Sequence, residues 1–218
     1  MLLFTFICAI LLVKYKRKER SEMENKPRVD RRTIKTKRAM HNALVALASV
    51  KPINKITVKE LTEKADVNRK TFYSHYSSIE DVLNEIEDEI LKKISAVFKE
   101  AYGNANVIEN PYYLFQSINV ALNTDMEFYK SYICSGAGNL VKIKVKNLVK
   151  QEGIELLKNV LPVSPEKVEI LMEYVASGVI ALYISWFKNE INISLEDVAH
   201  LCGTLARSGL EGFAIKKS

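Results

Sequence analysis

The chain has 218 residues, of which 48% are hydrophobic and 27% charged, so it can form a sizeable core with a soluble surface. Eight Gly and five Pro, with no low-complexity segment, favour a mostly helical protein with short connections. Charge is uneven: residues 14–75 contain 18 Lys and Arg against 7 Asp and Glu, and residues 76–218 contain 14 against 19. A basic first third is typical of a module that binds a polyanion, although a solubilising surface would give the same charge.

The first 22 residues differ from the rest of the chain. Leu2–Val13 is apolar apart from Thr5, and five basic residues follow in residues 14–20. A stretch of twelve residues is shorter than the about 20 that span a bilayer, and a signal peptide would have basic residues before the stretch and a cleavage site after it. We interpret residues 1–22 as an extension ahead of a start at Met23, with a weak membrane anchor or a docking segment as alternatives.

The cysteines and histidines do not indicate a chemical site. Cys8, Cys134 and Cys202 are far apart and show neither metal-ligand spacing nor an even disulfide framework, which suggests a reducing cytoplasm. The three histidines are isolated as well, and no nucleophile-elbow, Rossmann or phosphate-loop pattern occurs. We therefore expect no catalytic residue, no metal and no cofactor, and we expect a cytoplasmic, nucleoid-associated protein that is not an enzyme.

The first helical pattern begins at Arg31. Its apolar stripe follows the i, i+3, i+4, i+7 spacing and consists of Met40, Ala43, Leu44 and Leu47. Basic residues occupy the helix start and the opposite face, namely Arg31, Arg32, Lys35, Lys37 and Arg38. Lys51-Pro52 is expected to end this helix, because proline disfavours helical geometry in the residue before it.

Two short helices are predicted next, joined by a tight turn at residues 65–67. Thr57 and Glu60 form a capping box that starts the first one. Asn68 caps the second, which runs to about Tyr76. Phe72 and Tyr76 lie four residues apart, so they point the same way and should anchor that helix in the core.

A long fourth helix, expected over residues 79–101, opens with a second predicted capping box at Ser77 and Glu80. Two short helices braced by longer ones make a helix-turn-helix, whose second helix enters the major groove of DNA. The outward side chains suit this task, because Arg pairs with guanine, Thr contacts thymine or phosphate, and Tyr and His bind phosphate oxygens. Plain packing of the same helices is the alternative.

The stretch from Ile56 to Tyr76, above all Thr-Phe-Tyr-Ser-His-Tyr at its end, resembles the TetR/AcrR family of transcriptional regulators. The resemblance implies that positions 57 and 59 approach the DNA backbone, that positions 69–71 face bases, and that positions 73 and 75 clamp phosphates. The predicted DNA contacts are Arg32, Lys35, Thr57, Lys59, Asn68, Arg69, Lys70, Thr71, Tyr73 and His75.

Two positions depart from the family pattern. Asp66 stands where the family usually has glycine, but Asp tolerates left-handed geometry, so we expect the turn to survive. Ile79 stands where a phosphate-contacting lysine is common, which puts that contact in doubt. The residues Asn68-Arg69-x-Thr71-Phe72-Tyr73 are also similar to a subgroup of dihydroxyacetone-kinase regulators.

The last two predicted helices, residues 165–189 and 195–214, are apolar most of the way round and should be buried on two sides. In the family these helices pair with a twofold mate, so the resemblance implies a homodimer that reads major grooves about 34–36 Å apart. The predicted interface residues are Tyr174, Gly178, Leu182, Trp186, Cys202 and Leu205. A monomer with a larger core is the alternative.

An effector pocket is expected between the helices that follow residue 103. Its candidate residues are Tyr112, Phe115, Phe128, Tyr129 and Tyr132, although aromatic residues at such positions are commonly plain core. The effector, a small molecule or a protein, is not encoded in a readable pattern.

The sequence thus predicts an all-α protein of about nine helices. Its parts are an extension at 1–22, a three-helix helix-turn-helix domain at 23–78, and an effector-binding and dimerisation domain at 79–218, in which 79–101 is the connecting helix. We expect a ligand-responsive homodimeric repressor that binds an inverted-repeat operator in double-stranded DNA. The alternatives are a protein-interaction module or co-activator controlled by a partner protein, and a membrane-tethered regulator if residues 1–22 are an anchor.

Overall fold

The computed structural model describes residues 31–102, 107, 109–123, 125–158, 161 and 163–214. Within these residues there are nine α-helices and no strand, so the predicted all-α fold is confirmed. The predicted extension at residues 1–22 and the start at Met23 lie outside the described residues. The described residues divide between Ala39 and Met40 into two compact units.

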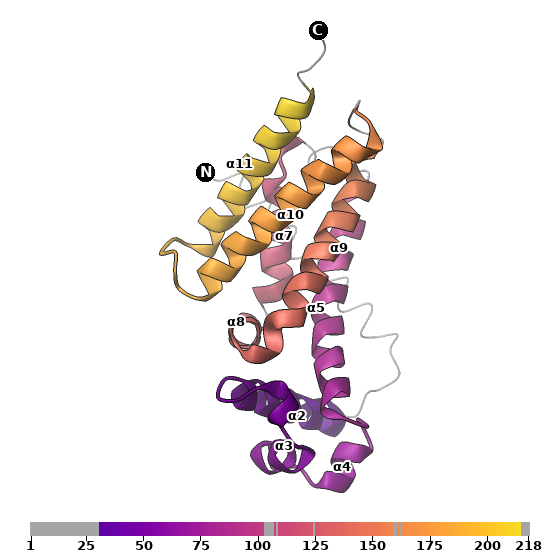
Figure 1. The fold of residues 1–218 in the computed structure, drawn as a ribbon, viewed down its shortest axis with the longest axis vertical. Helices are drawn as coiled ribbons and strands as arrows, with labels where there is room; N and C mark the ends of the chain where they lie inside the picture. The colour runs from indigo at the N-terminus through magenta and orange to yellow at the C-terminus, as the bar shows by residue number, and fades with distance from the viewer. Residues whose placement is uncertain are drawn as a thin grey trace. The chain divides into compact units, whose positions relative to one another are not determined.

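The helices are labelled in chain order in Figure 1. In chain order they are α2 (Arg31–Ala48), α3 (Val58–Ala65), α4 (Arg69–Tyr73), α5 (Ile79–Ala101), α7 (Tyr112–Asn123), α8 (Met126–Cys134), α9 (Asn139–Leu157), α10 (Pro165–Phe187) and α11 (Leu195–Ala214). Two short 3-10 helices, η1 (Ile53–Lys55) and η2 (Gly136–Gly138), stand before α3 and before α9.

The second half of α2 carries the predicted apolar stripe. Met40, Ala43 and Leu44 are buried and Leu47 is half-buried. The helix ends at Ala48, four residues before Pro52, in agreement with the prediction. The stripe is therefore part of the core of the chain.

The start of α5 corrects the predicted capping box. The box is formed by Ser78 and Asp81: the Asp81 backbone N–H donates to Ser78 Oγ at 3.3 Å, and the Ser78 N–H donates to Asp81 Oδ2 at 3.1 Å. The Ser77 N–H also donates to Asp81 Oδ2, at 2.7 Å. The prediction of Ser77 with Glu80 was wrong by one residue, because the Asp81 carboxylate reaches both serine amides and thereby fixes the first turn at Ile79.

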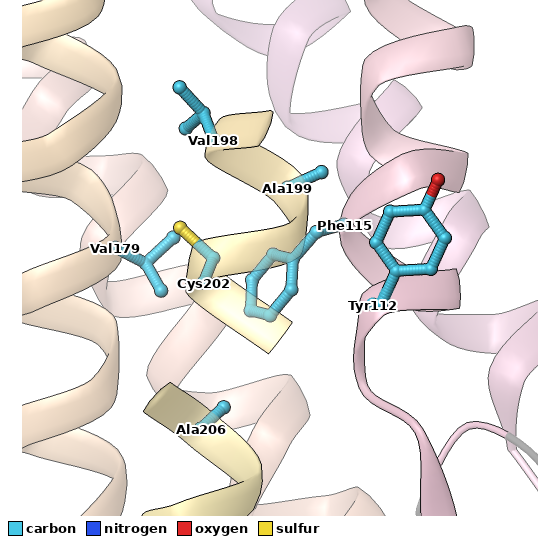
Figure 2. Packing of buried hydrophobic residues seen from close by; sticks show 7 residues of the cluster. All are labelled: Tyr112, Phe115, Val179, Val198, Ala199, Cys202 and Ala206. Atoms are coloured by element: carbon cyan, nitrogen blue, oxygen red, sulfur yellow. The ribbon is translucent and has the colours of Figure 1, made fainter. Parts of the chain in front are cut away.

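Helix α11 packs against α7 and α10. Figure 2 shows α11 between α10 and α7, with Cys202 facing Val179 of α10 and with Phe115 and Tyr112 of α7 on the other side. A Cβ on Gly203 would lie 2.6 Å from the Tyr112 backbone nitrogen. Only glycine allows α7 and α11 to approach this closely, so the packing of the protomer itself requires Gly203.

Of the described helices, α10 is long and apolar enough to cross a membrane by length and composition alone. The core helix of a soluble protein passes the same test. Val168, Leu171, Met172 and Ala176 of α10 are buried inside the chain, which accounts for one side of its apolar surface.

Candidate nucleic-acid interface and the domain behind it

The first short helix, α3, starts at the predicted capping box. The Glu60 N–H donates to Thr57 Oγ1 at 3.3 Å, and the Thr57 N–H donates to Glu60 Oε2 at 2.9 Å. Lys51 Nζ donates to the other carboxylate oxygen of Glu60 at 2.5 Å. The Lys51 ammonium, with the Thr57 donors, lowers the pKa of Glu60 to about 2. Both carboxylate oxygens of Glu60 thus accept hydrogen bonds, and this cap fixes where α3 begins.

The turn between α3 and α4 depends on Asp66. Its backbone is left-handed, with φ 53° and ψ 47°, as expected for a residue in place of the usual glycine. The Asp66 N–H donates to Glu63 O at 3.3 Å, and the Val67 N–H donates to Thr62 O at 2.9 Å. Asn68 then caps α4, because its Oδ1 accepts the Lys70 N–H at 2.8 Å. Both predictions for this turn are confirmed.

The second short helix, α4, has one buried face and one outward face. Phe72 is fully buried and Tyr76 nearly so, which confirms the predicted anchor. On the other side Arg69 and Lys70 are exposed, and Tyr73 is 60% exposed. The Tyr73 ring stands edge-on to the Phe72 ring, with ring centroids 5.3 Å apart. The buried Phe72 ring therefore helps to position the exposed Tyr73 side chain.

The structure brings eight of the ten predicted DNA contacts onto α3, α4 and the residues beside them. Thr57, Lys59, Asn68, Arg69, Lys70 and Tyr73 are exposed, and Thr71 and His75 are half-buried. The other two, Arg32 and Lys35, are exposed on the part of α2 that belongs to the separate first unit. Their contact with DNA stays a prediction.

A buried polar cluster behind α4 was not predicted. His41 of α2 is buried, and its Nε2 lies 3.1 Å from Tyr76 Oη and 3.3 Å from Glu85 Oε2. The Tyr76 hydroxyl also donates to Glu85 of α5. Burial, assisted by Glu85, raises the pKa of Tyr76. The cluster ties the residue that ends the helix-turn-helix to both α2 and α5.

Two contacts connect this region to the C-terminal helices. The His41 ring stacks on Phe128 of α8 with centroids 6.4 Å apart. Further along α5, the buried Glu87 accepts a hydrogen bond from the Tyr132 hydroxyl at 3.2 Å and forms an ion pair with Lys144 of α9. Burial, with the adjacent Glu87, raises the pKa of Tyr132. Buried ionic contacts of this kind constrain α8 and α9 to move with α5.

An apolar cavity of about 80 Å³ lies among the C-terminal helices. It is lined from α5 by Ile90 and Ile94, from α10 by Val179 and Tyr183, and by side chains of α7, α8 and α9. Of the five predicted pocket residues, Phe115 lines this cavity. The other four, Tyr112, Phe128, Tyr129 and Tyr132, are buried but are not part of its lining, because their rings pack against other aromatic rings. Their contact with an effector stays a prediction.

The helices α10 and α11 share an exposed apolar face, which we call the α10–α11 face. It comprises Ile170, Tyr174, Gly178, Leu201 and Leu205. Tyr174 is 74% exposed, and a groove of about 820 Å³ runs along the face with Cys202 at its floor. Large apolar side chains at this exposure, gathered on two helices, are typical of an interaction surface.

The predicted interface residues fall into three groups. Tyr174, Gly178 and Leu205 belong to the α10–α11 face. Leu182 and Trp186 are half-buried against the core, and the Trp186 indole N–H donates to Ile193 O at 3.0 Å. Cys202 is 1% exposed, and burial raises the pKa of its thiol to about 11. Its side chain is therefore part of the protomer core.

No group of three or more His, Cys, Asp and Glu side chains in the described part of the chain could hold a metal ion. The arrangement that remains is a capped helix, a left-handed turn and a second helix that is anchored by one aromatic face and exposes Arg, Lys and Tyr on the other. This is the geometry of a helix-turn-helix DNA-binding protein.

Comparison with known proteins identifies the kind of helix-turn-helix protein. The model described as bacterial regulatory proteins of the tetR family matches residues 42–86. A second model, described as a transcriptional regulator C-terminal region, matches residues 109–208. The chain belongs to the TetR family of transcriptional regulators, whose members bind DNA. The regulator domains that it matches indicate a non-enzymatic protein.

Individual relatives are more distant. The uncharacterized HTH-type transcriptional regulator YxbF of Bacillus subtilis (strain 168) is 35% identical over 63 residues, which are 28% of this chain and 17% of that protein. A solved transcriptional regulator of the TerR/AcrR family from Aquifex aeolicus VF5 has the same fold, with a TM-score of 0.55, 22% identity, and coverage of 81% of this chain and 98% of that chain. The dihydroxyacetone kinase operon activator DhaS is similar with a TM-score of 0.47 and 16% identity over 82% of this chain and 98% of that chain. The predicted subgroup stays a prediction.

Proposed function

We propose that this regulator is a ligand-responsive homodimeric repressor that binds an inverted repeat in double-stranded DNA. The observation that carries the proposal is the outward face of α4, where Arg69, Lys70 and Tyr73 are exposed while Phe72 is fully buried. A helix anchored in this way can lie in the major groove with its charged side toward base edges and phosphates. We propose that binding to the operator blocks transcription in the cytoplasm.

The α10–α11 face supports dimerisation. Gly178 lies within this exposed face, and nothing stands within 4 Å of the position where its Cβ would be. A glycine in the middle of a helix costs about 1 kcal/mol relative to Ala, and here no contact inside the protomer requires it. The close approach of a helix from a second copy of the chain would require glycine at this position. A dimer formed in this way would also bring two α4 helices to one operator.

The contacts behind α4 support a mechanism of response. A ligand in the apolar cavity would contact α5, α9 and α10 together. Since Glu87 joins α5 to α8 and α9, and the His41 ring meets Phe128, a rearrangement of these helices would be transmitted to the helix-turn-helix. We propose two states of the dimer, one with half-site spacing that fits DNA and one favoured by the ligand that does not.

The test is selection of sheared genomic DNA by the full chain, followed by salt-titrated anisotropy on the recovered fragments. We expect one or a few inverted repeats that are bound at nanomolar concentration with a steep salt dependence. Arg69→Ala should cost about 1–3 kcal/mol and relax base preference at one position, whereas an equal loss on every sequence would make Arg69 a phosphate contact. Weak binding without sequence preference would contradict the proposal.

Dimerisation is tested on its own with two substitutions at one position. Gly178→Arg introduces a long charged side chain into open space, so the protomer should stay folded while the dimer dissociation constant rises at least about a hundredfold. Gly178→Ala is the milder control, which should raise helix stability and weaken the dimer less. Sedimentation equilibrium of the two variants and of the wild type measures the effect. An Arg variant that dimerises as the wild type does would contradict an interface on this face.

A second candidate is a regulator controlled by a partner protein, and the observation that favours it is the size of the groove. The groove on the α10–α11 face, about 820 Å³, is far larger than the cavity of about 80 Å³. Sedimentation equilibrium also distinguishes these two candidates. A monomeric wild type would favour a regulator controlled by a partner protein over a homodimeric repressor. Cell fractionation of a tagged full chain, with and without residues 1–22, tests the membrane-tethered alternative.

A further inference from the structure

The cavity among the C-terminal helices has a lining that, in its described residues, exposes only apolar atoms. Thirteen of these fifteen residues are aliphatic or phenylalanine. Isoleucine is the most frequent of them and comes from four helices, α5, α7, α8 and α10, as Ile90, Ile94, Ile118, Ile133, Ile180 and Ile184. A ligand in the cavity would therefore contact hydrocarbon groups.

The other two lining residues have polar ends that bind elsewhere. The Tyr183 hydroxyl donates to Asn119 Oδ1 at 2.8 Å, and the Asn119 amide donates to Leu195 O at 3.1 Å. The Lys142 ammonium donates to Asn139 Oδ1 at 3.3 Å, in an exposed hydrogen bond. Tyr183 therefore presents its ring to the cavity and Lys142 its methylene groups, so the described part of the lining offers a ligand no donor or acceptor.

Such a lining disfavours water as an occupant. A buried water is held by hydrogen bonds to several polar partners, which the described lining lacks. Side chains beside an unfilled space also lose the dispersion contacts that they would make in solid core. An apolar molecule restores these contacts and gives up no hydrogen bonds when it leaves water. The chemistry of the cavity therefore favours an uncharged molecule without hydrogen-bonding groups.

The volume limits the size of that molecule. At about 80 Å³ the cavity is little more than half the ~150 Å³ of a protein cavity that accommodates benzene or xenon. A short chain of carbon atoms fits this volume better than an aromatic ring does. We propose that the cavity binds a short-chain hydrocarbon without polar groups. The inference rests on the proposed function in one respect, since it makes this hydrocarbon the ligand to which the repressor responds.

Helix α5 connects the cavity to the DNA-binding region. Ile90 and Ile94 of α5 are buried and line the cavity. Earlier on the same helix, Glu85 accepts a hydrogen bond from the hydroxyl of Tyr76, the residue that ends the helix-turn-helix. A hydrocarbon that packs against Ile90 and Ile94 would therefore act on the helix that holds Tyr76.

NMR of the full chain with labelled isoleucine methyl groups tests the site. The probes are xenon, propane and n-butane. We expect n-butane to shift the methyl resonances of the six lining isoleucines. The resonance of Ile86, which is buried on α5 outside the lining, should stay in place, as should that of Ile170 on the α10–α11 face. No shift at the lining isoleucines, or shifts confined to Ile170, would overturn the proposal.

The same titration with other probes tests the ligand class. 1-Propanol and propanoate are polar counterparts of n-butane, and benzene is a larger apolar probe. 1-Propanol should bind at least about tenfold more weakly than n-butane, because its hydroxyl would lose hydrogen bonds to water and gain none in the cavity. Benzene should also bind more weakly than n-butane. Equal affinity for n-butane and 1-propanol would overturn the proposal.

Substitutions test the role of the volume. Ile180→Ala enlarges the cavity, so benzene should bind at least about tenfold more tightly than it binds the wild type. Ile170→Ala is the matched control, because it makes the same change on the same helix at a residue that is exposed and does not line the cavity. Val145→Phe fills the cavity and should abolish hydrocarbon binding, with circular dichroism to confirm that the variant is folded. Unchanged benzene affinity in Ile180→Ala would overturn the proposal, whether or not Val145→Phe folds.

Operator binding separates this inference from the proposed function. n-Butane should release the wild type from its operator at concentrations set by its dissociation constant, and Val145→Phe should stay bound at those concentrations. A chain that binds its operator as a dimer but binds no hydrocarbon would leave the repressor proposal standing and overturn this inference. Hydrocarbon binding at the lining isoleucines without operator release would overturn the role of the hydrocarbon as the ligand to which the repressor responds.

Discussion

The helix-turn-helix and the C-terminal domain (α5–α11) are stabilised by contacts at different distances along the sequence. At the starts of α3 and α4, Thr57 bonds with Glu60 and Asn68 with Lys70, so these capping partners are two or three residues apart. In the C-terminal domain the Tyr183 hydroxyl donates to Asn119, 64 positions away. Local contacts form whenever the right residues follow one another, whereas distant contacts depend on the whole fold. Short sequence motifs therefore predict the caps of α3 and α4, whereas no short motif predicts the contacts of the C-terminal domain.

The two regions also differ in what they leave exposed. The helix-turn-helix presents Arg69, Lys70 and a phenol, and the C-terminal domain presents apolar side chains such as Tyr174 and Leu205. A charged surface favours a polyanion, and an apolar one favours another protein surface. Substitutions can test whether each region depends on its own kind of contact.

The largest effect is expected in the core of the helix-turn-helix. Phe72→Ala removes a fully buried ring and should lower the free energy of unfolding by about 3–5 kcal/mol. The control is the adjacent Tyr73→Ala, which should change stability by less than about 0.5 kcal/mol and yet weaken DNA binding. Urea unfolding and anisotropy measure the two quantities. Equal destabilisation by both variants would show that α4 is not anchored on one face.

The next effect compares a buried with an exposed carboxylate in the C-terminal domain. Glu87→Ala leaves Lys144 and the buried Tyr132 hydroxyl without their acceptor, and should cost about 3 kcal/mol. Glu173→Ala removes a surface partner of Lys146 and should cost much less, because exposed ion pairs contribute little to stability. Thermal unfolding of the two variants measures the difference. Similar costs would mean that the Glu87 contacts do not hold α5 to α8 and α9.

A smaller effect contrasts two glycines of opposite environment. Gly203→Ala places a methyl group against the Tyr112 backbone and should cost about 1–3 kcal/mol, because the backbone of α7 must shift. Gly178→Ala meets nothing and should stabilise the isolated protomer by up to about 1 kcal/mol. Chemical unfolding at a concentration where the chain is monomeric compares them. A stabilising Gly203→Ala would contradict the close contact of α7 and α11.

The turn offers an effect of opposite sign. Asp66→Gly should stabilise the protein by about 0.5–1 kcal/mol, because glycine adopts the left-handed backbone at φ 53° without a steric cost. Asp66→Val should destabilise it by a larger amount, since a β-branched residue is strained there. Thermal unfolding of both variants decides the sign, and a neutral valine variant would contradict the left-handed turn.

The smallest effect concerns pH. Because the pKa of Glu60 is lowered to about 2 in the folded protein, its stabilising contribution is complete above its ordinary pKa of 4.5 and is lost as the pH falls toward 2. Lys51→Met removes the main cause and should raise this pKa back toward 4.5. Carbon-detected NMR titration of the Glu60 carboxylate measures both values. An unchanged pKa in the variant would assign the shift to Thr57 alone.

The sequence could predict most of the helices and most of the helix-turn-helix. The caps at Thr57 and Asn68 and the Phe72–Tyr76 anchor follow from residues close together, and the structure confirms them. The box at the start of α5 was misplaced by one residue, because two serines and two acidic residues stand in succession there. Which serine caps the helix depends on the reach of one carboxylate, and that is not visible in the residue types.

The buried contacts between residues far apart in the sequence could not be predicted. Nothing near His41 in the sequence indicates Tyr76 or Glu85, and nothing near Glu87 indicates Lys144, which lies 57 positions away. Aromatic residues were expected to line the pocket, but of these only Phe115 does so. Most of the remaining lining is aliphatic, and an aliphatic residue at a cavity looks the same in the sequence as one in solid core.

The two described cysteines allow the opening of the C-terminal domain to be measured by thiol labelling. Cys134 is exposed, whereas Cys202 is 1% exposed with a thiol pKa of about 11, so a thiol reagent at neutral pH should modify Cys134 within the intrinsic chemical time. Modification of Cys202 must wait until α11 separates from α10. Its labelling rate therefore reports how often that helix pair opens at Cys202, without any introduced probe. Mass spectrometry of the labelled chain would measure that rate.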